Sequence, residues 1–428
     1  MSAGPSSTAA PAPSRRLILL LSVACGVAVA DIYFPQAISP LIADDLRVSP
    51  ESAAVVVTCA QLGYAAGIFL LVPLGDRLRH RGLVTTLLMV TCAGLVLAGT
   101  ATSLPVLAVA GALVGLTTVV PQILIPMAAG LTAPERRGAV TGTLLSGLIG
   151  GILLARTFSG TLGEWLGWRA PYLVAAGLVL VLGLALAAAL PATTPSTDQP
   201  YPALLAASLR LLRTEPLLRR SALYQVLVFA AFSAAWTALA LYLTGPAYHL
   251  GTPVVGVLAL VGAASMFATP IAGRRTDRRG PDAVNLVCMV AAVAAGALLL
   301  TGRLGGAVGL AGLGAGMLLL DVAVQCGQVA NQARILALRP EARARLNTAY
   351  MTCAFLGGSA GSWLGVRAYS AFGWNGVCGL VVLLSGLALL RHLLRARTEA
   401  PPRAGAGAPR TSSRPAAETT DRVPRRTG

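Results

Sequence analysis

Residues 170–190 read APYLVAAGLVLVLGLALAAAL, a run of 21 residues without a charged side chain. An α-helix of this length measures about 30 Å, which is the thickness of the hydrocarbon core of a bilayer. Strands of membrane barrels are shorter and alternate polar with apolar residues, so this run predicts a transmembrane helix.

The same character recurs along the chain, which has 428 residues, 55% hydrophobic and only 11% charged. Soluble domains carry roughly 25% charged residues, so the composition excludes an ordinary soluble enzyme or a nucleic-acid-binding module. The sequence predicts an all-α membrane protein. Its twelve expected spans are 17–41, 53–74, 83–102, 104–128, 139–162, 169–190, 221–244, 253–272, 283–302, 305–333, 346–368 and 374–394.

The basic residues lie mostly on one side of these spans. All 33 are arginines, against 16 acidic residues. With the amino terminus placed in the cytoplasm, 28 arginines fall in inward segments, 4 in outward segments and one, Arg156, inside a span. This follows the positive-inside rule, so we expect a multi-pass protein of the cytoplasmic membrane with both termini cytoplasmic. Anionic lipid accounts for the basic charge without nucleic acid.

The polar stretches divide the chain into two bundles. We expect six helices in residues 17–190, a cytoplasmic linker with a short amphipathic helix in 191–220, and six helices in 221–397. Residues 1–16 and 398–428 are rich in Ala and Pro and are expected to be disordered tails. Residues 28–30 resemble a signal-peptidase site, but an uncleaved first helix agrees better with the even number of spans.

An internal repeat relates the two bundles at a fixed offset of 206 residues. The matching pairs are Gln122 and Gln328, Pro134-Glu135 and Pro340-Glu341, Arg137 and Arg343, Gly151 and Gly357, and Gly167-Trp168 and Gly373-Trp374. Two repeats of six helices are typical of secondary transporters, whose substrate site lies near the midplane between the halves.

The loops after the second and eighth spans carry a common motif. Residues 75–81 read GDRLRHR and residues 273–280 read GRRTDRRG. Both resemble the loop signature of the major facilitator superfamily, G-x-x-x-D-R-x-G-[RK]. The second copy has both glycines, the aspartate and the arginine of the pattern, whereas the first has Val72 and Arg79 in place of the glycines.

This resemblance implies a twelve-helix transporter with a conformational latch. In that family the loop Asp and Arg pair with neighbouring helix ends in one state and release them in the other. The residues concerned are Asp76, Arg77, Asp277 and Arg278. The alternative is a pair of solvated turns that only fix the topology.

Shorter stretches, such as residues 61–64 and 155–157, are similar to a bacterial branch near the twelve-span drug/proton antiporters. The fifth span lacks the proline of that family's glycine-rich motif, and the fourth span lacks its arginine.

Three charged residues fall within predicted spans: Asp31, Arg156 and Asp321. Such residues are costly in lipid and point to function. Asp31 and Arg156 either form a structural ion pair or serve coupling. In the second case Asp31 exchanges a proton, while Arg156 tunes it or meets an anionic group of the substrate. Alternatively, Arg156 extends to the outer interface.

Asp321 is the stronger candidate for proton coupling. Gln325, Gln328 and Gln332 follow it at helical spacing on one face. A polar face must contact protein or a water-filled cavity, so the alternative role is an interhelical contact. The other candidates for a cavity lining are Gln61, Tyr64, Thr117, Gln122, Trp236 and Tyr242.

The leading hypothesis is a secondary active transporter that exports a small organic solute by proton antiport. A proton symporter importing a sugar or organic acid, or a non-transporting membrane sensor, would share most of these features. The sequence contains no metal-binding cluster, nucleophile motif or cofactor motif, and no Lys for a phosphate-binding loop. We therefore expect no enzymatic activity, no cofactor, and a monomer whose partners are substrate, protons and lipid.

Overall fold

The computed structural model describes residues 14–133, 136–191, 197 and 199–399. The two predicted disordered tails fall mostly outside this range, as do Pro134 and Glu135 of the repeat. Within the described part, helices account for nearly the whole chain and no strand occurs.

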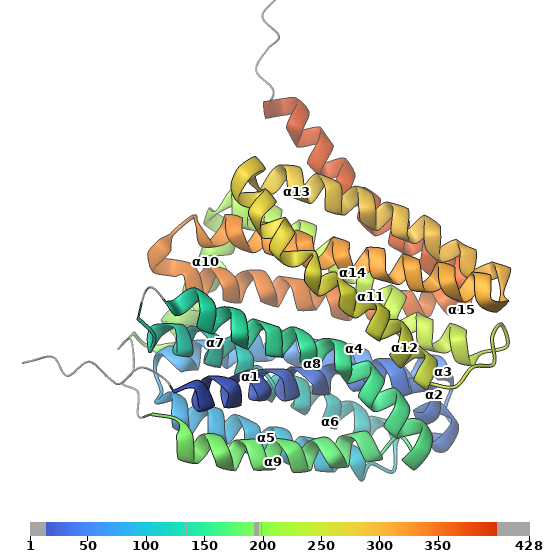
Figure 1. The fold of residues 1–428 in the computed structure, drawn as a ribbon, viewed down its shortest axis with the longest axis horizontal. Coiled ribbons are helices and arrows are strands. Elements are labelled where there is room, and N and C mark those ends of the chain that lie inside the picture. Colours follow the sequence, from blue (N-terminus) through green and yellow to red (C-terminus); the bar gives the residue numbers. More distant parts are fainter. Residues whose placement is uncertain (1–13, 134–135, 192–196, 198, 400–428) are drawn as a thin grey trace, which may run out of the picture.

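The first half consists of helices packed along a common direction (Figure 1). Its elements are α1 (Arg15–Ala30), η1 (Asp31–Tyr33), α2 (Phe34–Leu46), α3 (Pro50–Ala53), α4 (Val55–Leu70), η2 (Val72–Asp76), α5 (His80–Gly99), α6 (Leu104–Thr117), α7 (Val120–Gly130), α8 (Arg137–Leu166) and α9 (Ala170–Ala189).

The second half follows the linker helix α10 (Tyr201–Thr214) and lies above the first half in Figure 1. Its elements are α11 (Pro216–Thr244), α12 (Pro253–Gly262), η4 (Ala263–Phe267), α13 (Thr269–Leu299), η5 (Leu300–Leu304), α14 (Gly306–Leu336), η6 (Pro340–Ala342) and α15 (Arg343–Glu399).

Twelve spans are present, as the sequence predicts. Ten continuous helical stretches of the described chain are long and apolar enough to cross a membrane, and two of them have 52 and 53 residues. Each of these two contains a glycine in the left-handed region, Gly280 (φ 79°) and Gly373 (φ 60°). Because L side chains rarely adopt this backbone conformation, these glycines mark the turns at which each of the two long stretches divides into two spans.

Prolines interrupt the first and fourth spans near the middle of the first bundle. Pro35 has no N–H to donate to the carbonyl of Asp31, and Pro121 has none for Thr117. The first span is 3₁₀-helical at Asp31–Tyr33, and the fourth is non-helical at Thr118. The Thr118 hydroxyl donates to the Ala28 carbonyl, which joins the break in the fourth span to α1 just before the 3₁₀ segment.

The repeat is visible in how the helices pack. A Cβ added to Gly151 of α8 would meet the backbone of Gly26 in α1, and one added to Gly357 of α15 would lie 2.8 Å from the Val226 Cα in α11. Small residues at helix interfaces allow this close approach in membranes. The fifth span thus packs on the first as the eleventh packs on the seventh.

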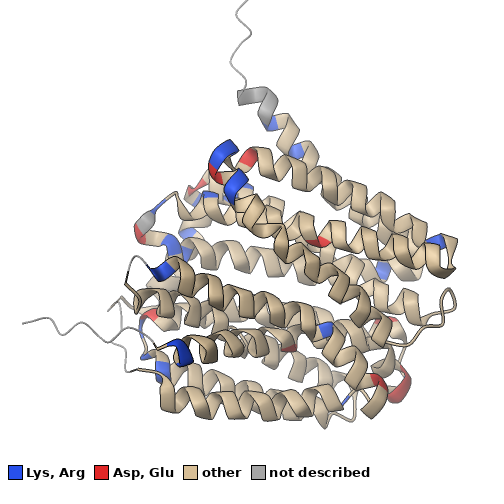
Figure 2. Cartoon of the chain, viewed as in Figure 1, with Lys and Arg blue, Asp and Glu red and all other residues tan. Residues whose placement is uncertain are grey.

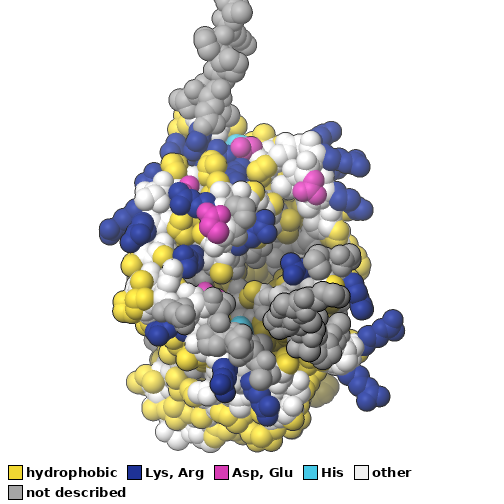
Figure 3. Space-filling view, turned by 90° about the vertical axis from the view of Figure 1, so that its left-hand side faces the viewer, with side chains coloured by type: hydrophobic (Ala, Val, Ile, Leu, Met, Phe, Trp, Pro, Cys, Tyr) yellow, Lys and Arg dark blue, Asp and Glu magenta, His cyan; other side chains and the backbone are white. Residues whose placement is uncertain are grey.

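The charges separate toward the two ends of the bundles. Arginines cluster at one end (left in Figure 2), hereafter the arginine-rich end, and Figure 3 shows them spread over that face. The opposite, arginine-poor end carries Arg47, Arg169, Arg303 and Arg367. The five helix-connecting segments with several arginines are at the arginine-rich end, in agreement with the counted asymmetry.

The linker forms the expected short helix and contacts both halves. The Tyr201 hydroxyl donates to the Leu70 carbonyl at 2.6 Å, and Arg345 Nη2 donates to Gln199 Oε1 at 3.2 Å. The helix α11 begins at Pro216 rather than at the expected residue 221, because Pro216 is well suited to the first turn and the helix extends past the apolar segment.

Candidate functional site

Arg156 lies at the junction of the two halves, although it belongs to α8 of the first. It is only 1% exposed. Its Nε donates to Gln36 Oε1 at 2.8 Å, and its Cζ lies 4.2 Å from the centre of the Trp236 ring in α11. The rings of Tyr33 and Phe232 lie 4.9 and 5.8 Å from the same carbon. The charge is therefore held by aromatic faces and one amide.

Asp321 of α14 meets the other edge of the same tryptophan. Trp236 Nε1 donates to Asp321 Oδ1 at 3.3 Å. Asp321 Oδ2 and Arg156 Nη2 have no hydrogen-bond partner among the described residues. We call Arg156, Trp236 and Asp321 the central triad. It brings a cation, an aromatic ring and a carboxylate from three helices to one buried place.

Asp31 forms no ion pair with Arg156 in the described part of the chain. It is 2% exposed at the start of the 3₁₀ segment, and neither of its carboxylate oxygens has a hydrogen-bond partner among the described residues. Its electrostatic neighbour is Tyr172 of the sixth span. The side chain thus faces the interior of the first bundle, whereas Arg156 reaches across to the second.

Arg156 also does not extend to the arginine-poor interface, which was the third alternative from the sequence. Its side chain is enclosed by Tyr33, Phe232 and Trp236 instead. Neither the ion pair with Asp31 nor the extension to the interface agrees with this placement. The remaining alternative for Arg156, a contact with an anionic group of the substrate, stays a prediction.

A line of aromatic side chains leads from the central triad to the first half. Trp236 contacts Phe232, Phe232 stacks on Phe229, Phe229 contacts Phe355, and Phe355 contacts Tyr64 with ring centres 4.4 Å apart. Phe229, Phe232 and Phe355 did not emerge from the sequence, because single phenylalanines in apolar spans resemble ordinary packing residues.

Polar groups flank this aromatic line. Gln122 Nε2 donates to the Tyr64 hydroxyl at 3.4 Å, and the Ser233 hydroxyl donates to Gln61 Oε1 at 3.5 Å. Gln61 Nε2 and Gln36 Nε2 have no partner among the described residues. The predicted Gln61, Tyr64, Gln122 and Trp236 therefore gather around one region between the halves.

The polar stripe of α14 runs from Asp321 toward the arginine-rich end. Gln328 accepts from Gln225 at 3.3 Å, and Gln332 donates to Asn347 at 3.4 Å. Gln325, Gln328 and Gln332 are all half-buried. The stripe therefore contacts α11 and α15 while remaining partly accessible.

Two candidates lie elsewhere. The Thr117 hydroxyl shares a hydrogen bond of 2.8 Å with Thr91 of α5, within the first bundle. Tyr242 donates to the Gly302 carbonyl at 3.1 Å and stacks on Trp374 at 4.5 Å, near the arginine-poor end. Both side chains join helices of one bundle and do not reach the central triad.

The loop residues of the predicted latch have few contacts in this state. Asp277, Arg77 and Arg278 are exposed, and Asp277 has no ion pair within the described residues. The Asp76 carbonyl accepts from the backbone N–H of Thr197 in the linker at 3.2 Å. Asp76 is also an electrostatic neighbour of His80.

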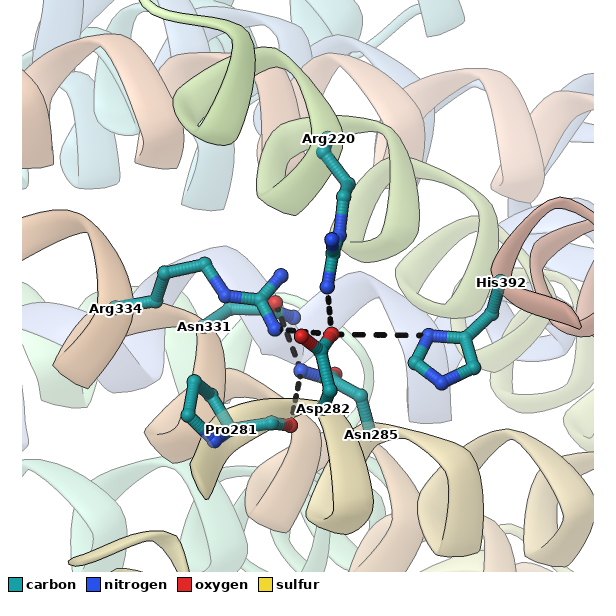
Figure 4. Close-up of polar contacts among 7 residues, drawn as sticks. All are labelled: Arg220, Pro281, Asp282, Asn285, Asn331, Arg334 and His392. Carbon is teal, nitrogen blue, oxygen red and sulfur yellow. Dashed lines mark hydrogen bonds and ion pairs between the residues drawn. The ribbon is translucent and has the colours of Figure 1, made fainter. Parts of the chain in front are cut away.

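A charged cluster that the sequence did not reveal surrounds Asp282, the second residue after Gly280 (Figure 4). Its Oδ1 accepts from Arg334 Nη2 at 2.5 Å, pairs with Arg220, and lies 3.9 Å from His392 Nδ1. Beside it, Asn285 Nδ2 donates to Asn331 Oδ1 at 3.1 Å. The cluster joins the seventh, ninth, tenth and twelfth spans. In the sequence, only the position of Asp282 at the start of a helix, where an acidic side chain is favourable, could have indicated it.

The halves touch directly toward the arginine-poor end. The Thr252 hydroxyl before α12 lies 2.9 Å from the Gly160 carbonyl and 2.8 Å from Glu164 Oε2, both in α8. The Thr157 hydroxyl donates to the Gly256 carbonyl at 2.9 Å. Figure 1 shows α8 and α12 crossing toward this end. We call these contacts the α8–α12 seal.

No group of three or more metal-binding side chains occurs in the described part of the chain. The site consists of one buried arginine, buried carboxyls, amides and aromatic rings. Such a lining can bind a small organic molecule and exchange a proton.

Comparisons with known proteins agree with this architecture. The chain is 38% identical over 368 residues to the uncharacterized transporter YgaY of Escherichia coli O157:H7, covering 85% of this chain and 92% of the relative. It is 32% identical over 292 residues to the chloramphenicol resistance protein of Streptomyces lividans, covering 67% and 71%.

Solved structures share the fold at low sequence identity. A variant of the nucleoside transporter NupG has a TM-score of 0.69 at 14% identity, covering 89% of this chain and 100% of that chain. A bacterial homologue of the human lysosomal transporter Spinster, in an inward-facing and occupied conformation, has a TM-score of 0.66 at 14% identity, covering 90% and 97%.

The family model of the Major Facilitator Superfamily matches residues 19–334. Together with twelve spans in two repeated bundles and relatives that are transporters, this match makes the chain a multi-pass membrane transporter and not an enzyme. The protein belongs to the Major Facilitator Superfamily.

Proposed function

We propose that the protein exports a small organic solute by proton antiport, using alternating access around the central triad. The observation that carries this proposal is the position of Arg156, Trp236 and Asp321, which are buried where the two halves meet. In transporters built from two repeats, the substrate site lies at this interface.

The lining suits an amphipathic solute. Trp236, Phe232 and Tyr33 offer aromatic faces, and Arg156 Nη2, Gln36 Nε2 and Gln61 Nε2 are donors without a protein partner among the described residues. A solute with a ring and a carbonyl or anionic oxygen would satisfy both. The likeness to a chloramphenicol resistance protein supports a solute of this kind and its export.

Asp321 is the proposed site of proton coupling. When ionised, it faces Trp236 and the positive charge of Arg156 across the junction of the halves. Protonation removes its charge, and the attraction between α14 and α8 weakens. Antiport requires that solute binding and protonation of Asp321 favour different states, and we propose that the solute binds the state in which Asp321 is ionised. Asp31, buried nearby in the first span, is a second proton site.

The proposed orientation places the arginine-rich end in the cytoplasm, with both termini there. Because the α8–α12 seal lies at the opposite end, the structure then corresponds to a state closed toward the outside. The proposed latch of Asp76, Arg77, Asp277 and Arg278 would form its contacts when the arginine-rich end closes.

The test uses inside-out vesicles containing the wild-type protein, an imposed proton gradient and a pH-sensitive dye. A panel of solutes is added, chloramphenicol included, and antiport appears as solute-dependent loss of the gradient. Asp321→Asn should abolish this response. The matched control is Asp44→Asn, because Asp44 is exposed at the arginine-poor end.

Other outcomes would reject the proposal in distinct ways. Proton-driven accumulation of a solute in right-side-out vesicles would indicate import by symport. Solute binding without proton or solute flux, in protein that remains folded, would indicate a sensor. Undiminished pH-dependent transport by Asp321→Asn would exclude Asp321 as the coupling residue.

A further inference from the structure

A cavity of about 390 Å³ lies away from the central triad, at the arginine-poor end. Its walls come from the start of the second span, with Glu51, Ser52 and Val55, and from the end of the eleventh, with Trp363 and Arg367. It therefore lies at the boundary between the two halves. The volume is within the range of small-molecule sites.

The cavity presents opposite charges that are not joined to each other. No ion pair between Glu51 and Arg367 occurs among the described residues, and the Arg367 guanidinium lies 5.6 Å from the centre of the Trp363 ring. The Glu51 carboxylate lies beside the hydroxyls of Ser49 and Ser370, one from each half. A ligand that fits both walls carries a negative and a positive group.

An exposed apolar track leads from the cavity toward the middle of the molecule. Val55 and Leu62 are seven residues apart on the second span and are 39% and 49% exposed. Leu356 and Trp363 have the same spacing on the eleventh span and are 46% and 48% exposed. Seven residues are two helical turns, so each pair marks one face. Because the two helices pack together through Thr58 and Ser359, the faces flank a common boundary.

We propose that this cavity binds the headgroup of phosphatidylethanolamine from the leaflet at the arginine-poor end, with its acyl chains along the apolar track. The phosphate pairs with Arg367, and the ammonium donates to Glu51 and the serine hydroxyls. A choline headgroup has no N–H to donate, and a glycerol headgroup has no positive charge for Glu51. The site therefore distinguishes phosphatidylethanolamine from both.

Such a lipid holds the two halves together, because its partners are Glu51 on one half and Arg367 on the other. This role does not depend on the transported solute or on proton coupling.

The test is native mass spectrometry of the full chain in detergent, titrated with phosphatidylethanolamine, phosphatidylcholine or phosphatidylglycerol of the same acyl chains. The wild type should bind phosphatidylethanolamine most tightly. Arg367→Gln should weaken that binding about tenfold, as expected for loss of one charge-assisted contact. Glu51→Gln should remove the preference for phosphatidylethanolamine over phosphatidylcholine.

Arg303→Gln is the matched control, because Arg303 is also exposed at the arginine-poor end but lies outside the cavity. Equal binding of the three lipids by the wild type overturns the proposal, and this comparison requires no variant. An equal loss of binding in Arg303→Gln overturns it as well. If soluble glycerophosphoethanolamine binds as tightly as the lipid, the ligand is a free zwitterion and the lipid assignment is wrong.

Discussion

The Arg156 guanidinium lies 4.2 Å from the centre of the Trp236 ring, and the two side chains belong to opposite halves of the chain. The same indole donates to Asp321. One ring thus contacts both the buried cation and the buried carboxylate. A change in either charge therefore alters the contacts at the place where α8, α11 and α14 meet.

Replacing Arg156 with Lys should reduce solute transport about tenfold or more. A lysine keeps the charge but loses the planar group that stacks on Trp236 and the Nε–H that donates to Gln36. The initial rate in proteoliposomes measures the effect, and Arg303→Lys is the control for an exposed arginine. Wild-type rates in Arg156→Lys would mean that only the positive charge matters.

The α8–α12 seal should open more readily in Thr252→Val. The valine cannot form the hydroxyl contacts with the Gly160 carbonyl and Glu164 that close the arginine-poor end. Hydrogen–deuterium exchange should increase in the arginine-poor halves of α8 and α12. Thr244→Val is the control, since among the described residues the Thr244 hydroxyl bonds only to the Ala240 carbonyl of its own helix, at 2.9 Å. Equal exchange in the two variants would show that the seal does not depend on Thr252.

Two adjacent glycines of the fifth span should respond differently to the same substitution. A Cβ at Gly151 would meet the Gly26 backbone, whereas one at Gly150 has no atom within 4 Å. Gly151→Val should therefore force α1 and α8 apart and lower the stability by about 1–3 kcal/mol. Thermal unfolding in detergent compares it with Gly150→Val. Equal melting temperatures would contradict the close packing of these helices.

The sequence predicts the spans and the repeat because both depend on features along one helix. Apolar length sets a span, and a fixed offset identifies Gly151 with Gly357 and Gly167 with Gly373. In the structure the first pair lies at equivalent helix contacts, and both members of the second have positive φ. Backbone geometry requires glycine at these positions, so the requirement is visible in the sequence itself.

The partners of buried charges are harder to predict. Depth in the membrane follows from the helical rise, and it placed Asp31 and Arg156 at a similar level. The direction in which each side chain points depends on the 3₁₀ break at Asp31–Tyr33 and on which bundle a long side chain reaches. Arg156 therefore meets Trp236 of the second half, while Asp31 faces Tyr172. In the same way, Asp282 lies just before the predicted span 283–302, and its arginine partners lie 62 residues before it and 52 after it, so no pattern along one helix connects them.

Asp282→Asn should destabilise the second bundle by about 1–3 kcal/mol, because Arg220 and Arg334 would lose the carboxylate they share. Their side chains are only 9% and 6% exposed, so water replaces the lost contact poorly. Asp277→Asn, five residues earlier, is the matched control, because Asp277 is a similarly exposed aspartate without an ion pair among the described residues. Thermal unfolding of both variants gives the comparison, and transport assays separate stability from the latch. If Asp277→Asn leaves stability unchanged but impairs transport, Asp277 acts in another conformational state and Asp282 maintains the bundle. If both variants unfold like the wild type, the Asp282 cluster does not stabilise the fold.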